Sequence, residues 1–231
     1  MMPPHQFRRL EEIARAAART AEAAHDFGHV RRVAVSARAI AEAEGADLDI
    51  ALPAALLHEL VSLPKDHPDS PRSGYLCAEL AADMLQKEGY SIERVEAVAY
   101  CIRVHPFSLG VVPETLEAKV LQDADRLDAL GAIGIARCFA VGAALGRPFY
   151  DPDDPFWRGR EPDDKHWTLD HFGRKLLRLP ETLHTPSGRE IARGRATFLE
   201  AFLRQLEQEI GPACTAEFCE GETPARQAPL R

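Results

Sequence analysis

The chain has 231 residues, 45% of them hydrophobic, and carries a formal net charge of -8. A chain of this length can bury one sizeable core, so a single domain is expected. The acidic balance argues against a large DNA or RNA partner, because proteins that bind nucleic acids usually have a surplus of basic residues. A small phosphorylated ligand remains compatible with it, because a metal ion or local cations can supply the positive field.

The first residues of the chain and its cysteines indicate a cytoplasmic protein. His5, Arg8 and Glu11 lie in a start that has charge but not the apolar run of a secretory leader. The five cysteines are odd in number and form no close CxxC pair, so reduced thiols are expected. No stretch is long and apolar enough to span a bilayer, so we expect no membrane partner. The oligomeric state is not visible in the sequence.

Apolar residues at helical spacing, many alanines and few aromatics predict an all-α fold, a single-domain helical bundle. Asp26 is suited to cap the second helix, and Gly45 ends it. In chain order, we expect helices over about the first 20 residues and over residues 26–45, 48–61, 74–88, 92–104, 114–130, 169–177 and 190–210.

Three segments are expected to lack helical structure. Residues 62–71 contain three prolines, which break the helical hydrogen-bond ladder and predict an ordered loop. Gly146–Lys165 is rich in Pro, Asp and Trp, and connections of this length are often lids or binding loops. Residues 211–231 mix Gly, Pro and charge, which predicts a flexible tail after a domain that spans residues 1–210.

The segment Glu114–Leu130 predicts a central helix, because it is apolar on two sides. At 100° per residue, one side carries most of its leucine and valine, and Leu121 lies on a second side with Asp125 and Asp128. The remaining strip is polar and consists of Lys119, Gln122 and Arg126. Carboxylates on the inner sides of a central helix need partners, because a buried unpaired charge is costly.

Three short patterns place imidazole or carboxylate in apolar helical surroundings: His25–His29, His58-Glu59 and Asp123–Asp128. Each has an ordinary explanation when taken alone, as a helix cap, a buried pair or a solvated acidic face paired with Arg126. Together they favour a metal site, because a metal is a natural partner for so many inward polar groups. Imidazole with carboxylate suits Mn, Fe, Zn, Ni or Mg.

These patterns resemble the H…HD…D pattern of HD-domain metal-dependent phosphohydrolases, at His29, Ala54–Glu59 and Asp123–Asp128. Stretches such as Val61–Pro68 and Leu116–Val120 are similar to a bacterial nucleotide-pyrophosphatase-like subfamily. The resemblance covers roughly residues 20–205. It has one departure, since the family has Asp directly after the second histidine and this chain has Glu59, which is longer by one methylene.

The resemblance implies an HD-type bundle with one divalent ion, which is Mn, Mg, Fe, Ni or Zn. The implied ligands are His29, His58, Glu59 and Asp125. A metal-bound water then attacks a phosphoryl group, and the ion neutralises charge on that group.

Residues near these ligands are candidates for catalysis and substrate binding. Asp128, one turn after Asp125, is suited to orient a ligand or water, and His25 is equally suited to that role or to a helix-start hydrogen bond. The loop after His58-Glu59 offers a phosphate clamp and a proton acceptor, or alternatively a turn whose charges face solvent. The expected catalytic residues are Lys65, Asp66 and Asp128, and the expected substrate contacts are Lys65, His67, His105 and Arg126.

The function implied by the subfamily is hydrolysis of a small phosphorylated molecule, a nucleoside triphosphate cleaved to a monophosphate and pyrophosphate. One alternative is a phosphomonoesterase that acts on nucleoside monophosphates. Another is a weakly active regulatory module that binds metal or nucleotide, in which the change to Glu59 has cost activity. A diiron oxygenase is a further alternative, and it needs additional ligands such as His67 and His105.

Overall fold

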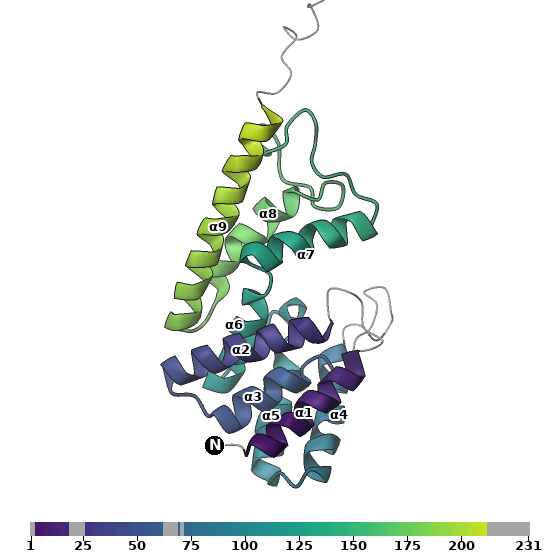
Figure 1. The fold of residues 1–231 in the computed structure, drawn as a ribbon, viewed down its shortest axis with the longest axis vertical. Coiled ribbons are helices and arrows are strands. Elements are labelled where there is room, and N and C mark those ends of the chain that lie inside the picture. Colours follow the sequence, from purple (N-terminus) through teal and green to yellow (C-terminus); the bar gives the residue numbers. More distant parts are fainter. Residues whose placement is uncertain (1–2, 19–25, 62–68, 70–71, 212–231) are drawn as a thin grey trace, which may run out of the picture.

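The computed structural model describes residues 3–18, 26–61, 69 and 72–211, and within these ranges the regular structure is entirely helical. The helices form two groups, one above the other in Figure 1. The first group holds α1 (Pro4–Ala17), α2 (Phe27–Glu44), α3 (Leu48–Leu57), α4 (Ser73–Lys87), α5 (Ile92–Val104) and α6 (Leu116–Leu127). The second holds α7 (Gly131–Ala144), α8 (Asp170–Arg174) and α9 (Pro186–Ile210), with 3₁₀ turns at Phe107–Leu109 and Leu176–Thr182.

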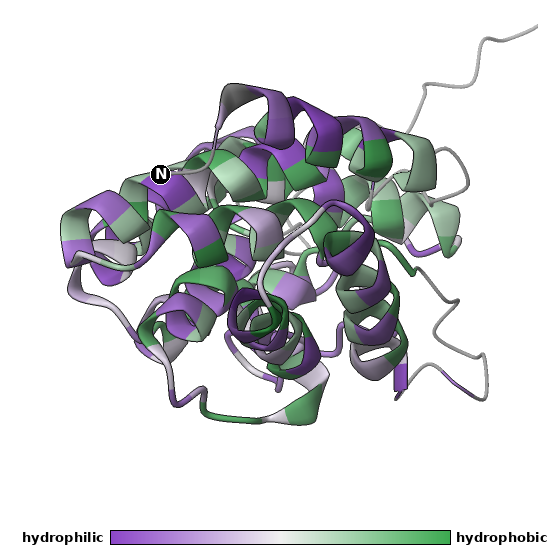
Figure 2. Cartoon of the chain, turned by 90° about the horizontal axis from the view of Figure 1, so that it is seen from below, coloured by the Kyte–Doolittle hydropathy of each residue, from purple (hydrophilic) through white to green (hydrophobic). Residues whose placement is uncertain are grey.

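The first group is a bundle in which α2, α3, α5 and α6 pack on one another, with α1 and α4 outside. In the second group α7 packs on α9, which also reaches α2 and α6. The helices in Figure 2 carry alternating hydrophobic and hydrophilic bands, as amphipathic helices do. Many of the buried residues are alanines, which allows close packing between helix axes. The all-α prediction is confirmed.

Local sequence signals explain where α2 and α5 begin and end. Asp26 caps α2, because its carboxylate accepts a hydrogen bond of 2.9 Å from the backbone N–H of His29. Gly45 ends α2 with a left-handed φ of 76°, which a glycine adopts without steric cost. Ser91 caps α5, whose bounds of Ile92–Val104 match the prediction. These caps place His29 on the third residue of α2.

Several predicted helix bounds are wrong, among them the start of the last helix, which is Pro186 instead of Glu190. Helix α3 ends at Leu57 instead of near residue 61, so His58 follows it in a turn. The expected helix 114–130 ends at Leu127, and the chain bends by 64° into α7, which we did not predict. Gln122, on the strip predicted to be polar, is buried, and its amide donates to the carbonyls of Val104 and Val111.

The connection between α7 and α8 has no helix, as expected, and is held by a buried ion pair. Asp170 is fully buried and accepts hydrogen bonds from Arg160 and from the backbone N–H of Asp163. Trp157 has a left-handed φ of 46°, and its ring packs against Gly173 so closely that a Cβ there would come within 2.7 Å. Trp157 is therefore engaged in packing.

Residues 212–231 lie outside the described ranges, so the division into a domain of 1–210 and a tail stays a prediction. Within the described ranges, no single helix is long and apolar enough to cross a membrane. Helices α6 and α7 reach that length and composition only as a bent pair.

Candidate metal centre

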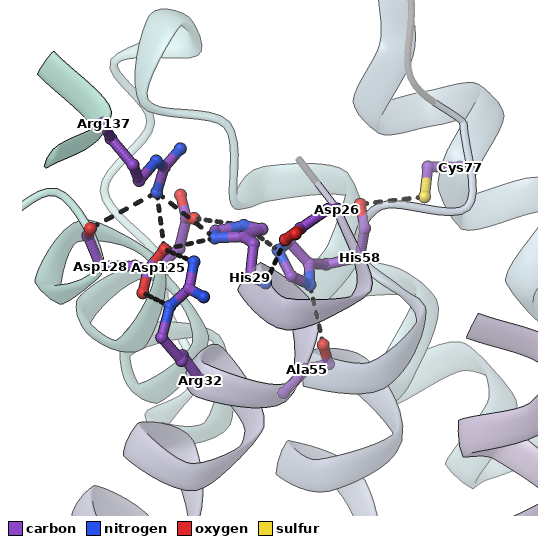
Figure 3. A network of polar contacts seen from close by, with 9 residues as sticks. All are labelled: Asp26, His29, Arg32, Ala55, His58, Cys77, Asp125, Asp128 and Arg137. Carbon is purple, nitrogen blue, oxygen red and sulfur yellow. Dashed lines mark hydrogen bonds and ion pairs between the residues drawn. The ribbon is translucent and has the colours of Figure 1, made fainter. Parts of the chain in front are cut away.

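Three of the predicted ligands converge in the structure. His29 comes from the first turn of α2, His58 from the turn after α3, and Asp125 from the last turn of α6. One ligand atom from each lies within 4.8 Å of the other two, an arrangement that can hold a metal ion. Both imidazoles are buried, whereas the Asp125 side chain is 26% exposed. Figure 3 shows the three side chains turned towards one another.

The hydrogen bonds of the two histidines fix which nitrogen faces the centre. Nδ1 of His58 lies 2.8 Å from the carbonyl oxygen of Ala55, which can only accept, so Nδ1 carries the proton. Nδ1 of His29 lies 2.7 Å from the carboxylate of Asp128, which assigns its proton in the same way. In their neutral forms, both rings therefore turn an unprotonated Nε2 inward.

The two inward nitrogens fit a divalent ion. The Nε2 atoms of His29 and His58 lie 3.2 Å apart, with the His29 nitrogen 3.5 Å from Asp125 Oδ1. Burial lowers the pKa of His58 to about 4, so this ring is neutral at pH 7. Two facing lone pairs repel unless a cation lies between them, and nitrogens that share one ion at about 2.1 Å lie near this separation. The donor set is that of Zn, Mn, Fe or Ni.

Asp128 holds His29 in place and is itself held by two arginines (Figure 3). Its buried carboxylate accepts hydrogen bonds of 2.7 Å from His29 Nδ1, Arg32 Nε and Arg137 Nη1. Burial raises the pKa of Asp128, but the hydrogen bonds from His29 and Arg32, with the charge of Arg137, outweigh it and hold the pKa below its usual range. A carboxylate in this position orients a metal-binding imidazole and raises its basicity.

The turn that carries His58 is anchored by a cysteine that the sequence did not single out. Cys77 on α4 is buried, and its thiol lies 3.1 Å from the carbonyl oxygens of both Leu57 and His58. Burial raises the pKa of Cys77 to about 12, so the thiol keeps its proton and can donate. This contact fixes the backbone where α3 ends.

The centre opens on a groove of about 570 Å³ between the two helix groups. His58, Glu59 and Asp125 line one part of it. Among the described residues, the groove is lined by five basic side chains, Arg126, Arg137, Arg147, Lys165 and Lys175. Three carboxylates, Glu59, Asp125 and Asp164, also line it. The basic side chains outnumber them, so the groove has a positive surplus in a chain whose net charge is -8.

The structure places the other predicted site residues as follows. His105 and Arg126 line the groove, and Arg126 lies over the ring of Phe107, with 5.3 Å between its guanidinium carbon and the ring centroid. Arg126 donates to Gln122 and to the carbonyl of Thr182, instead of pairing with Asp123. Glu59 lines the groove, but its carboxylate is not in the cluster of three ligands.

Four of the predicted site residues lie outside the residues that the structure describes: His25, Lys65, Asp66 and His67. Four basic residues of the groove were not predicted from the sequence: Arg137, Arg147, Lys165 and Lys175. No local pattern indicates them, because the groove forms only when α7 and the connection after it fold back towards the bundle.

A family model for the HD domain matches residues 9–130, which hold all three converging ligands and most of the first helix group. The chain belongs to the HD-domain family. The HD-domain match ends at Leu130, so α7, α8 and α9 come after the matched segment in the chain. The predicted family is thereby confirmed.

Relatives of this HD-domain protein are similar over nearly their whole length. The uncharacterised Bacillus subtilis protein YpgQ is 39% identical over 197 residues, which cover 84% of this chain and 87% of YpgQ. A crystal structure of YpgQ in complex with ADP superposes with a TM-score of 0.71 at 33% identity, over 91% of this chain and 98% of that one. An HD-superfamily hydrolase from Bacillus thuringiensis gives 0.70 at 32% identity, over 89% and 96%. These similarities support a phosphohydrolase enzyme.

Glu59→Ala is expected to retain the ion, because His29, His58 and Asp125 remain. We expect its dissociation constant for Mn²⁺ to rise by no more than about tenfold, the low end for groups that do not bind the ion directly. Metal titration of Glu59→Ala beside Asp125→Ala makes the comparison, and Glu59→Asp shows whether the shorter carboxylate changes affinity. If Glu59→Ala loses the ion as fully as Asp125→Ala does, Glu59 is a ligand.

Proposed function

We propose that this protein hydrolyses a phosphorylated small molecule in a metal-dependent reaction, and that the substrate is a nucleoside triphosphate cleaved to a monophosphate and pyrophosphate. One observation carries the proposal: the ligand cluster and five basic side chains share one groove. The binding of ADP by the relative YpgQ supports a nucleotide as the ligand.

In the proposed reaction His29, His58 and Asp125 would hold the divalent ion. Such an ion would supply Lewis-acid chemistry, which lowers the pKa of a water molecule and offsets charge on the phosphoryl group. The chain itself supplies orientation, because Asp128 and the carbonyl of Ala55 keep both Nε2 atoms aimed at the centre. The basic side chains of the groove bind the phosphate oxygens, and they act strongly because the groove is partly shielded from water.

The test is a screen of phosphorylated compounds with Mn²⁺ or Mg²⁺ and analysis of the products. Nucleoside triphosphates are expected to yield pyrophosphate and a monophosphate in equal amounts, and a chelator is expected to abolish the reaction. Release of inorganic phosphate from monophosphates alone would favour a phosphomonoesterase. Failure to turn over any phosphorylated compound would reduce the protein to a metal- or nucleotide-binding module.

A further inference from the structure

Arg137 on α7 contacts Asp128 and lines the groove beside His58 and Asp125, although it is twelve residues beyond Asp125 in the chain. Two glycines make the turn that brings it there. Gly131 has a left-handed φ of 69°, and a Cβ on Gly134 would lie 2.1 Å from the carbonyl oxygen of Ala129. Helix α7 therefore starts tightly against the end of α6 and directs Arg137 back towards Asp128.

The contacts of Arg137 use one end of its guanidinium. Nη1 donates to Asp128 Oδ2 at 2.7 Å and lies 3.4 Å from the Asp128 carbonyl oxygen and from His29 Nδ1. None of the described residues accepts a hydrogen bond from Nε or Nη2 of Arg137. The side chain is 24% exposed and lines the groove, so these remaining donors are accessible from it.

Arg32 provides a comparison within the same cluster. It holds the same carboxylate from the opposite side, through Nε at 2.7 Å and Nη2 at 3.0 Å (Figure 3). Arg32 does not line the groove. Arg32 also faces the negative charge of Asp26. Of the two arginines, only Arg137 presents its guanidinium to the groove.

We propose that Arg137 binds a phosphate oxygen of the substrate beside the metal ion while its Nη1 stays on Asp128. The inference rests on the proposed function, in which a phosphate occupies this groove. Arginine suits the task because its planar fork can serve two acceptors at once and stays charged. Asp128 then fixes both a metal-binding imidazole and a phosphate-binding guanidinium, which sets the position of the phosphate relative to the ion.

The test measures binding of pyrophosphate and of ADP to the Mn²⁺-loaded protein by calorimetry, without turnover. Arg137→Gln is expected to weaken both by about 10- to 100-fold, as loss of a charged hydrogen bond predicts. Arg137→Lys should recover part of the affinity, because it keeps the charge and loses the fork. Arg158→Gln should leave these affinities within about threefold of the parent, since Arg158 is an exposed arginine that pairs with Glu207 and does not line the groove.

Two results would overturn the inference: equal losses in Arg137→Gln and Arg158→Gln, or pyrophosphate and ADP affinities of Arg137→Gln equal to those of the parent. A parent that binds neither compound would overturn it as well. A parent that binds both and hydrolyses no nucleotide would sink the proposed reaction, while the Arg137 comparison would still decide the inference. Circular dichroism and Mn²⁺ titration of each variant separate loss of phosphate binding from loss of fold or metal.

Discussion

His58→Ala is expected to lose the divalent ion and to lower hydrolysis by about 1,000-fold, because the metal supplies several kcal/mol to phosphoryl transfer. The ring removed is fully buried and provides one of two Nε2 donors that lie 3.2 Å apart. The parent should also gain about 2.7 kcal/mol of stability at a Mn²⁺ concentration one hundred times its dissociation constant. His58→Ala should gain almost none.

Metal analysis after dialysis and thermal unfolding with and without Mn²⁺ measure both effects. His166→Ala is a matched control, because His166 is an exposed imidazole that pairs only with Asp163 among the described residues. It should bind and respond to the ion as the parent does. An unchanged metal content in both His58→Ala and Asp125→Ala would show that the ion binds elsewhere.

Asp128→Asn is expected to weaken Mn²⁺ binding by about 10- to 100-fold, although Asp128 is not in the ligand cluster. An amide has one acceptor oxygen in place of the carboxylate that serves His29, Arg32 and Arg137. Its charge is lost too, which leaves the two arginines without their counterion. We expect a cost of about 3 kcal/mol in the free energy of unfolding, the low end for a broken buried pair, because Arg32 is partly in water.

Asp123→Asn is a control that separates the loss of Mn²⁺ affinity from the loss of stability. Asp123 is a fully buried carboxylate on the same helix, and it accepts hydrogen bonds from the backbone of His184 and from the backbone and hydroxyl of Thr185. These contacts anchor the start of α9 and do not involve the metal cluster. Urea unfolding should show a loss for both variants, whereas Mn²⁺ titration should show one only for Asp128→Asn. Equal Mn²⁺ affinities in the two would contradict a role of Asp128 in orienting His29.

The parts of the fold that could be predicted are those with local signals. The stripe and caps of α2, from Asp26 to Gly45, and the bounds of α5 follow from residues a few positions apart. Helix α7 was missed because it lacks such signals. It contains Gly131, Gly134 and Gly142, each poor in helix propensity, and its apolar residues show no single stripe. Its packing against α9 stabilises it, and a contact between distant segments is not visible in the sequence.

The residues of the site also differ in whether a local pattern in the sequence indicates them. His29, His58 and Asp125 could be found because each lies in a recognisable pattern on a buried segment. The hydrogen bond that His29 donates to Asp128 joins residues 99 positions apart, and no local pattern predicts it. Arg137 is harder still, because its position depends on the direction of the turn at Gly131. The residue types were visible in the sequence, whereas their partners depended on the tertiary fold.

Helix α6 makes contacts on all its sides, and these contacts limit the insertions and deletions that the chain can tolerate. Gln122 reaches the end of α5 and the segment after it, and Asp123 reaches the start of α9. Asp125 belongs to the metal cluster, and Asp128 accepts a hydrogen bond from Arg137 on α7. Deleting one residue near the start of α6 would rotate all four by about 100° about the helix axis and shift them by about 1.5 Å along it. No single compensating substitution could restore four separate directions. Changes in chain length are therefore expected outside α6, because α6 must keep its phase.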